Sequence, residues 1–187
     1  MALTREEKIT LLKIARASIE SELKGVALEL PNITSPNLLE KRGAFVTLHK
    51  HGQLRGCIGN FASEKPLYET VADMALQAAF HDPRFMPLEI HELNDIDIEI
   101  SALTPLTPIR NVDEIEVGKH GIYIINGPYR GVLLPQVATE YGWDKYTFLD
   151  QTCIKAGMMP GCWRDPNTQI LIFSAEVFGE KSEGLIF

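Results

Sequence analysis

The sequence lacks three features that would place it in a specialised class of proteins. It has no run of lysine or arginine, and 18 basic against 25 acidic residues give a net charge of −7. Nucleic-acid binding depends on clustered positive charge, so this composition argues against an RNA or DNA groove. No apolar run approaches the roughly 20 residues of a membrane-spanning helix. The start, MALTREEKIT, is charged where a signal peptide would be apolar, so we expect a cytoplasmic protein.

Cysteine is also scarce, with only Cys57, Cys153 and Cys162. Their number and spacing fit neither a disulfide framework nor a CxxC pair, and no Cys/His pairs have zinc-site spacing. We therefore expect free thiols in a reducing compartment, and no metal site. The sequence also lacks a phosphate loop and a dinucleotide fingerprint, so it assigns no cofactor.

The length of 187 residues suits one domain, and 45% apolar residues are ordinary for a globular protein. Thr4 and Glu7 form a capping box ahead of apolar residues at helical spacing, which predicts a first helix ending at Gly25. Pro66 predicts the start of a second helix, which ends near His81 because a proline follows two residues later.

Strands are predicted between and after these helices. Alternating isoleucines predict a strand over 96–101 with an acidic outer face that includes Glu99. Further strands are predicted over 121–125, 130–134 and 169–177, with a short helix over 146–155. Hairpin-joined strands interrupted by helices predict an α+β fold with a mostly antiparallel sheet and flanking helices.

A hairpin carries the most distinctive stretch, LRGCIGN at 54–60. A three-residue loop over 50–52 would pair His49 with Gln53 and place glycine in the left-handed position. A two-residue turn would break the alternation of apolar residues, so we prefer the longer loop. The core face then holds Ala44, Val46, Leu48, Leu54 and Ile58. The other face holds Phe45, Thr47, His49, Arg55 and Cys57, with Thr47 opposite Arg55.

Cys57 has two interpretations. A guanidinium favours the reactive thiolate, and Arg55 lies roughly 6.5 Å away on the same face of the strand. Gly56 and Gly59 would let another backbone or a substrate approach closely. A free cysteine is, however, commonly a small buried hydrophobic residue, and the pattern alone favours that interpretation.

Three other places hold candidate side chains. The segment 81–92 is rich in His, Asp and Glu but has no metal-ligand spacing, so we expect Asp82 to cap a turn and Arg84 to pair with a surface carboxylate. Glu99 is interpreted first as part of a solvated strand face. His120, between two glycines, could act as a base for Cys57 if the fold brings the two together.

The hexapeptide LRGCIG at 54–59 resembles the signature of the AMMECR1 domain family, and the likeness spans nearly the whole chain. The other matching blocks are FHDPRFMPL at 80–88, DIEIS at 97–101, GKHGI at 118–122, RGVLLPQVATEYGWD at 130–144 and FLDQTCIKAG at 148–157. The chain is most similar to the bacterial and archaeal branch, called AmmeMemoRadiSam system protein A.

This resemblance implies an intracellular α+β domain with a larger and a smaller lobe and the signature in a cleft between them. It also implies a pathway or complex shared with a Memo-like protein and a radical SAM enzyme. The family's biochemical function is not established. Its recurring positions correspond here to Arg55, Gly56, Cys57, Ile58, Gly59, Asp82, Pro83, Arg84, Phe85, His120, Gln136, Glu140, Cys153 and Lys155.

Two functional hypotheses follow. In the first, the protein is an enzyme with Cys57 as nucleophile, Arg55 stabilising the thiolate or an anionic substrate, and His120 as acid or base. In the second, it is a non-catalytic module that docks a protein partner or a small ligand. We rank the enzyme first. The binding residues of either hypothesis are Arg55, Gly56, Gly59, Arg84, Glu99 and Gln136.

Overall fold

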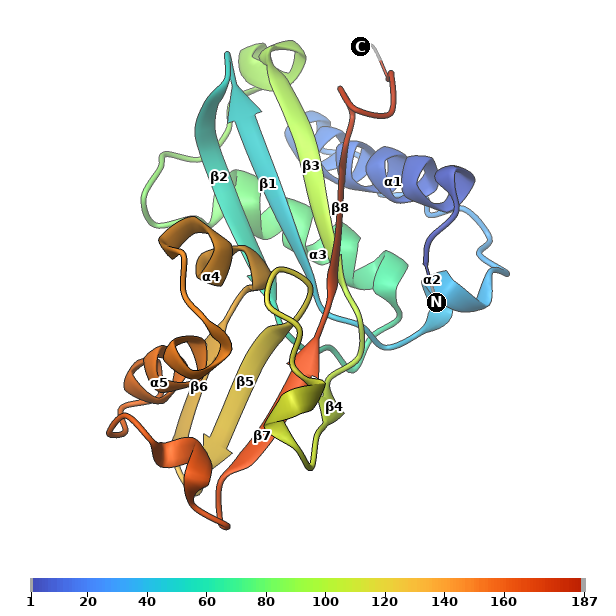
Figure 1. The fold of residues 1–187 in the computed structure, drawn as a ribbon. Helices are drawn as coiled ribbons and strands as arrows, with labels where there is room; N and C mark the ends of the chain where they lie inside the picture. Colours follow the sequence, from blue (N-terminus) through green and yellow to red (C-terminus); the bar gives the residue numbers. More distant parts are fainter. Residues whose placement is uncertain (1, 186–187) are drawn as a thin grey trace. The chain divides into compact units, whose positions relative to one another are not determined.

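The computed structural model describes residues 2–185, which divide into two compact units. The first unit comprises the chain up to Leu103 together with the residues from Glu176 onward, and the second is Thr104–Ala175. Each unit contains a four-stranded sheet with helices (Figure 1). The predicted α+β class is confirmed.

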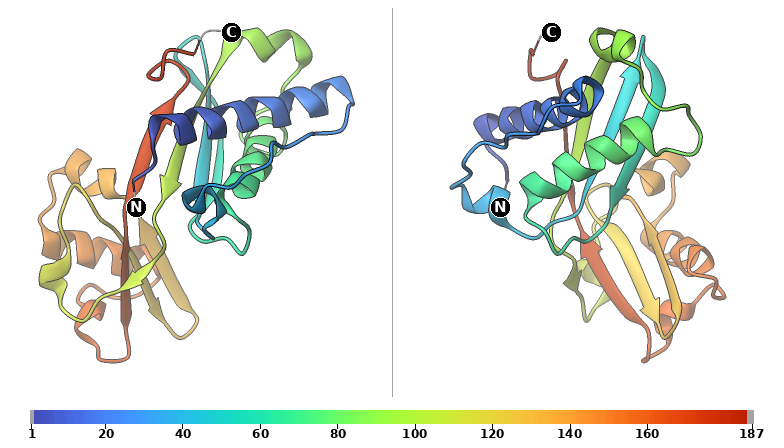
Figure 2. Two further views of the ribbon diagram at one scale, coloured as in Figure 1. Left: turned by 90° about the vertical axis from the view of Figure 1, so that its right-hand side faces the viewer. Right: turned by 180° about the vertical axis from the view of Figure 1, so that it is seen from behind.

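The sheet of the first unit has the strand order β2-β1-β3-β8. These strands are β1 (Ala44–Lys50), β2 (Gln53–Asn60), β3 (Ile96–Leu103) and β8 (Ala175–Gly179). Strand β1 pairs antiparallel with both β2 and β3. The helices are α1 (Arg5–Lys24), α2 (Pro36–Leu39) and α3 (Leu67–Phe80), and the short 3-10 helix η1 (Ile90–Asp95) precedes β3. Helices α1 and α3 pack on the same face of this sheet (Figure 2).

The helix signals in the sequence are confirmed. Thr4 caps α1 through reciprocal hydrogen bonds with Glu7, and Gly25 ends the helix with φ +66°. Helix α3 ends at His81, as the following proline predicts. Its apolar stripe packs with that of α1 on the inward side chains of the sheet, because Val46, Ile98 and their alternate neighbours point to the helices.

A buried ion pair ties α1 to the end of the first unit. Arg16 donates to Glu180 through Nε at 2.7 Å and Nη2 at 2.8 Å, and both side chains are almost completely buried. Glu180 also accepts from the Ile98 backbone N–H on β3, at 2.8 Å. The pair therefore connects three segments that lie far apart in the sequence.

The sheet of the second unit has the order β4-β7-β5-β6. Its strands are β4 (Thr107–Pro108), β5 (Gly121–Asn126), β6 (Tyr129–Leu133) and β7 (Gln169–Phe173), and every neighbouring pair is antiparallel. Its helices are α4 (Pro135–Tyr141) and α5 (Lys145–Lys155), with the 3-10 helices η2 (Val112–Glu114) and η3 (Cys162–Arg164). The predicted strand over 169–177 is wrong in one respect, because it divides into β7 and β8, which belong to different sheets.

The second unit also overturns the prediction of three free thiols. Cys153 on α5 and Cys162 on η3 form a disulfide, and Cys57 is the free cysteine. The chain reverses after α5 and returns η3 to the helix, so residues with no recognisable sequence spacing become neighbours. Asp150 stabilises this return by accepting from the Gly161 backbone N–H and from the Trp163 indole N–H, both at 2.8 Å.

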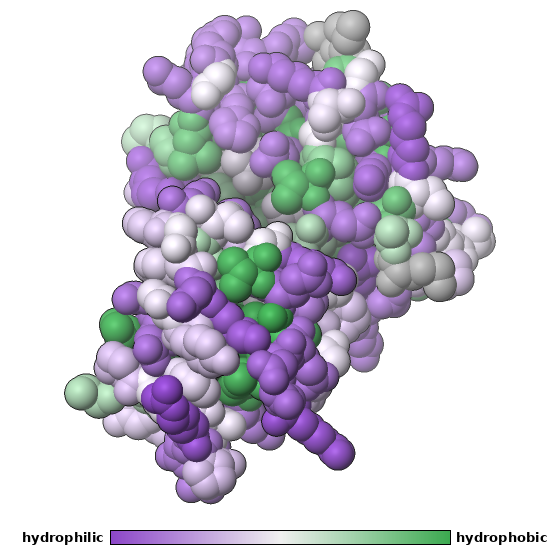
Figure 3. All heavy atoms as spheres, viewed as in Figure 1, coloured by the Kyte–Doolittle hydropathy of each residue, from purple (hydrophilic) through white to green (hydrophobic). Residues whose placement is uncertain are grey.

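Across residues 2–185, every helix is too short or too polar to cross a bilayer. The surface seen in Figure 3 is mostly hydrophilic, with small and separate hydrophobic areas.

Candidate functional site

The hairpin that carries Cys57 differs from the predicted hairpin in its turn. Lys50 pairs with Gln53 across a two-residue turn, in which His51 and Gly52 have φ +52° and +78°. Positive φ at both central positions is the pattern of a type I′ turn, which matches the twist of the paired strands. The predicted three-residue loop and the pairing of His49 with Gln53 are therefore wrong.

A β-bulge restores the alternation that this short turn would otherwise break. His49 pairs with Leu54, but Leu48 pairs with Gly56, which leaves Arg55 as the additional residue. Leu54 is 41% exposed and does not belong to the core, contrary to the prediction. The bulge explains how a two-residue turn coexists with buried Val46 and Leu48.

Cys57 lies directly opposite Thr47, where the prediction placed Arg55. The Thr47 hydroxyl donates to the Cys57 Sγ at 3.2 Å. The Cys57 backbone N–H donates to Asp82 Oδ2 at 3.0 Å, and its carbonyl accepts from Arg84 Nη2 at 3.3 Å. Cys57 is only half-buried, so it is not a fully packed core residue.

Asp82 and Arg84 hold the loop after α3 against the edge of β2. Asp82 is buried and accepts from Arg84 Nε at 3.0 Å, from Arg84 Nη2 at 2.7 Å and from the Arg84 backbone N–H at 3.1 Å. The Arg84 guanidinium, with the backbone donors of Cys57 and Arg84, outweighs burial and holds the pKa of Asp82 well below its usual range. Asp82 caps the turn as expected, but the carboxylate partner of Arg84 is a buried one.

Arg55 is engaged elsewhere. Its Nε and Nη2 donate to the two carboxylate oxygens of Glu92 at 3.0 and 3.1 Å, and Lys50 adds a third contact at 2.9 Å. The Arg55 hydrogen bonds, with help from the Glu89 backbone and Lys50, lower the pKa of Glu92 to about 2 against the effect of burial. The Arg55 side chain is 13% exposed, whereas that of Arg84 is 55% exposed. Arg84 is therefore the accessible guanidinium next to Cys57.

The two signature glycines accommodate the protein's own backbone. A Cβ on Gly56 would lie 2.2 Å from the Ala78 carbonyl oxygen of α3, and one on Gly59 would lie 2.4 Å from the Ala44 carbonyl oxygen. The expected close approach is thus made by a helix and by the neighbouring strand. The assignment of Gly56 and Gly59 to substrate binding stays a prediction.

The sheet face opposite α1 and α3, here called the outer face, carries a row of polar residues on three adjacent strands. Cys57 pairs with Thr47, and Thr47 pairs with Glu99. Two residues further along β1, on the same face, His49 pairs with Asp97. These five residues are all half-buried, whereas Val46 and Leu48 on β1 and Ile98 and Ile100 on β3, which alternate with them, are fully buried. Glu99 is thereby placed two strands from the thiol.

His120 and Gln136 belong to the second unit. His120 Nδ1 accepts from the Glu116 backbone N–H at 3.0 Å, and burial, followed by the charge of Lys119, lowers the pKa of this imidazole. Gln136 is exposed on α4. The pairing of His120 with Cys57 and the binding role of Gln136 stay predictions.

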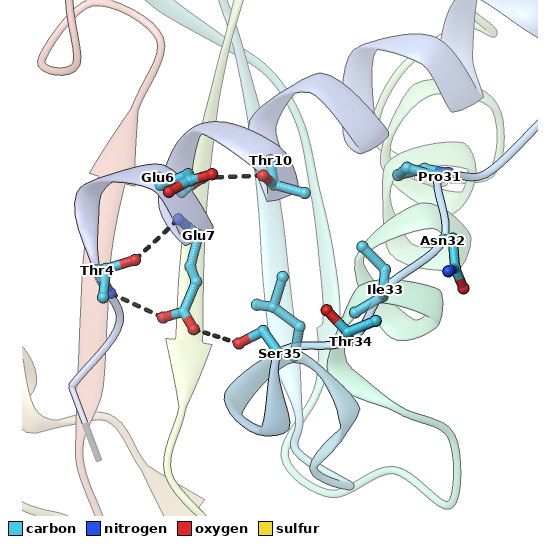
Figure 4. Close-up of a pocket in the computed structure, with 10 residues that line it drawn as sticks. Thr4, Glu6, Glu7, Thr10, Pro31, Asn32, Ile33, Thr34 and Ser35 are labelled. Carbon is cyan, nitrogen blue, oxygen red and sulfur yellow. Dashed lines mark hydrogen bonds between the residues drawn. The ribbon is translucent and has the colours of Figure 1, made fainter.

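Two grooves of the first unit were considered as binding sites. One, of about 570 Å³, is lined by Arg55, His91, Glu92 and the segment 86–89. The other, of about 350 Å³, lies at the start of α1 (Figure 4). In this second groove the Glu7 carboxylate already accepts from the Thr4 backbone and from Ser35 and Asn37, so it is occupied by hydrogen bonds within the protein. The first groove is the better candidate.

No group of three His, Cys, Asp or Glu side chains suited to a metal ion occurs within residues 2–185.

Comparison with known proteins identifies the family. The AMMECR1 family profile matches residues 12–178. The chain belongs to the AMMECR1 family. A protein from Methanothermobacter thermautotrophicus is 46% identical over 185 residues, covering 95% of this chain and 96% of the relative. A protein from Nanoarchaeum equitans is 42% identical over 179 residues, covering 92% of this chain and 99% of the relative.

A member of known structure supports the fold. The crystal structure of an uncharacterized protein from Pyrococcus horikoshii matches with a TM-score of 0.75 and 41% sequence identity. The match covers 93% of this chain and 91% of that protein. The AMMECR1 fold is thus shared across relatives that span nearly the full chain.

Sequence reasoning missed the contribution of Glu92 and Lys50. The only signal available was an acidic residue in the segment 81–92, which also holds two other carboxylates and two histidines. The choice of Glu92 as the partner of Arg55 depends on the bulge at Arg55 and on η1, and neither is visible in residue spacing.

Proposed function

We propose that this AMMECR1-family protein is a cysteine-dependent enzyme in which Cys57 is the nucleophile. The observation that carries the proposal is the setting of the half-buried Sγ, which accepts a hydrogen bond from Thr47. The Arg84 guanidinium is fixed to the carbonyl of the same cysteine. A hydrogen-bond donor and a nearby cation both favour the thiolate, which is the nucleophilic form of cysteine.

Arg84 replaces Arg55 in this proposal as the group that interacts with negative charge. Its Nε and one Nη2 hydrogen are directed to the buried Asp82, which fixes the plane of the guanidinium. Among the described residues, Arg84 Nη1 has no hydrogen-bond partner, and the side chain is more than half exposed. A guanidinium held in this way supports binding of an anionic group on a substrate.

The family resemblance supports the cellular setting of this proposal. The resemblance implies an intracellular protein that shares a pathway or complex with a Memo-like protein and a radical SAM enzyme.

The experiment is alkylation of the intact protein with iodoacetamide across a pH series, followed by peptide mapping. Because Cys153 and Cys162 form a disulfide, Cys57 is the expected site of labelling without reductant. We expect native Cys57 to be alkylated faster at neutral pH than Cys57 in the urea-unfolded chain, because the thiolate is the reactive form. Arg84→Gln should slow this alkylation by up to about tenfold.

Arg130→Gln is the matched control, because this arginine is exposed and belongs to the second unit. Its alkylation rate should equal that of the wild type. If native Cys57 is labelled no faster than Cys57 in the urea-unfolded chain, the enzyme proposal is wrong.

A non-catalytic binding module is the second candidate, and the groove beside Arg55 favours it. Met86, which lines this groove, is 80% exposed, an unusual fraction for a large apolar residue. Under this alternative, Met86→Ser would weaken capture of a Memo-like or radical SAM partner, and Cys57→Ser would leave it intact. The enzyme proposal instead expects Cys57→Ser to abolish turnover.

A further inference from the structure

Three polar residues on the outer face of the first unit stand on three adjacent strands in the order nucleophile, imidazole and carboxylate. Cys57 is on β2, His49 on β1 and Asp97 on β3. All three are half-buried, and each has a buried neighbour on the opposite face of the sheet: Gly56 beside Cys57, Leu48 beside His49, and Ile96 and Ile98 beside Asp97. Their placement follows from the strand register. That register includes the bulge in the β1–β2 ladder between Leu48 and His49.

His49 lies two residues from Thr47 along β1, on the same face of the sheet, and the Thr47 hydroxyl contacts the Cys57 sulfur. Side chains in this diagonal relation have Cα atoms about 7–8 Å apart, which is within reach of an imidazole and a thiol. His49 and Asp97 are directly opposite each other, where β-carbons are about 4.5–5.5 Å apart. Both distances allow contacts through ordinary changes of side-chain rotamer.

The His49 imidazole is available for this role. Within the described part of the chain it makes no hydrogen bond or ion pair, so both ring nitrogens are free. His120 differs, because its Nδ1 already accepts from the Glu116 backbone N–H. A neutral imidazole has one lone pair in the ring plane, so His120 would have to break this bond before accepting a proton.

We propose that His49 is the general base for Cys57, that Asp97 orients His49, and that the reaction is acyl transfer from an ester, thioester or amide. This inference rests on the proposed function and assigns it a base and a substrate class. A nucleophile, a base and an orienting carboxylate are the recurring requirements of acyl transfer, whatever the fold that supplies them.

These groups account for each proton transferred and each bond formed or broken in the reaction. The Cys57 thiol proton passes to His49, and the sulfur attacks the carbonyl carbon to form a carbon–sulfur bond. The carbonyl electron pair moves onto oxygen, where Arg84 Nη1 stabilises the negative charge. Collapse of the tetrahedral species expels the alcohol, thiol or amine, which takes the proton from His49. Water then attacks the thioester by the same route and restores the Cys57 thiol.

Four charged or titratable groups surround His49 on this face. Asp97 and Glu99 come from β3 and Cys57 from β2, while Lys181, after β8, forms an ion pair with Asp97 at 3.4 Å. The Lys181 ion pair helps to fix the Asp97 carboxylate, which lies opposite His49 across the β1–β3 pair. Asp97 is therefore a positioning residue in this scheme.

The test is the pH dependence of Cys57 alkylation in His49→Gln, with His51→Gln, at the exposed histidine of the neighbouring turn, as the matched control. Glutamine keeps the polarity of histidine but takes up no proton. We expect His49→Gln to slow alkylation at neutral pH at least about tenfold and to move the alkylation profile to higher pH. Asp97→Asn should slow alkylation by a smaller factor. His51→Gln should match the wild type.

A second readout tests the substrate class. Incubation with p-nitrophenyl acetate should acetylate Cys57, detected by peptide mass spectrometry, and His49→Gln should slow this step. Thermal unfolding of each variant shows whether it is folded. For a His49→Gln variant that does not fold, the imidazole titration of wild-type His49 by NMR is compared with that in Cys57→Ser, and coupled groups give different midpoints.

The outcomes separate the two proposals. A reactive wild-type Cys57 with an unchanged profile in His49→Gln overturns the base assignment and leaves the cysteine enzyme in place. A reactive Cys57 that resists acetylation overturns the acyl-transfer class. An unreactive wild-type Cys57 overturns the proposed function, and the inference with it.

Discussion

The two units of the protein are stabilised by different chemistry. In the first unit all five arginines pair with acidic side chains, and Arg16, Arg55 and Arg84 do so with buried or nearly buried carboxylates. In the second unit none of the arginines described by the structure forms an ion pair, and a disulfide joins α5 to η3. The first unit should therefore be sensitive to loss of charge and to acid, and the second to reduction.

The largest expected effect is loss of the buried ion pair in the first unit. Glu180→Gln removes the carboxylate that pairs with the buried Arg16, and breaking a buried ion pair costs about 3–5 kcal/mol. The measurement is the free energy of unfolding from urea titration. Glu20→Gln is the control, because it breaks the exposed pair with Lys24 and should cost less than about 1 kcal/mol. Equal effects of the two substitutions would contradict the assigned difference in burial.

The second unit should respond to removal of its cross-link. The disulfide joins residues nine apart, and the chain-entropy relation gives about 2–3 kcal/mol for a loop of this size. Cys162→Ser should lower the stability of the second unit by this amount, and hydrogen exchange should increase in α5 and η3 while β1 to β3 stay protected. Cys57→Ser, the thiol control, should leave α5 unchanged. Unaltered exchange in α5 after reduction would argue against a stabilising disulfide.

Sequence patterns predicted the elements whose causes are local. The capping box of Thr4 and Glu7, the stop at Gly25 and the alternation over 96–101 each depend on neighbours within a few residues. The partners of the site depend on long-range geometry. Asp82 reaches Cys57 across 25 positions and Glu92 reaches Arg55 across 37, and no local pattern specifies which carboxylate does so.

The error at the hairpin shows why the candidate site was only partly predictable. Alternation correctly assigned Cys57 to the face opposite Val46 and Leu48, but it assumed an unbroken ladder. One additional residue in β2 moved Arg55 out of that alternation and left Arg84, from a different loop, as the cation beside the thiol. A residue pairing that depends on a bulge can be assigned only once the strand register has been observed.

The smallest expected effect is the contribution of Glu92 to acid sensitivity. Its pKa is about 2 in the folded protein and 4.5 in the unfolded reference, so the unfolded chain takes up the proton first. The resulting stabilisation is fully present above the unfolded value and is lost as the pH falls toward the folded one. From about pH 4.5 to about pH 3.5 the loss is about 1 kcal/mol.

The measurement is urea unfolding of wild type and Glu92→Gln at several pH values. The variant is less stable at neutral pH, since Arg55 loses its carboxylate, but its stability should fall less steeply over this acidic range. Glu69→Gln is the control, because this carboxylate on α3 forms no salt bridge among the described residues and interacts with Lys65 only at longer range, so the variant should keep the wild-type slope. If Glu92→Gln keeps the wild-type slope as well, Arg55 does not hold Glu92 ionised, and the contrast between the closed Arg55 pair and the accessible Arg84 loses its support.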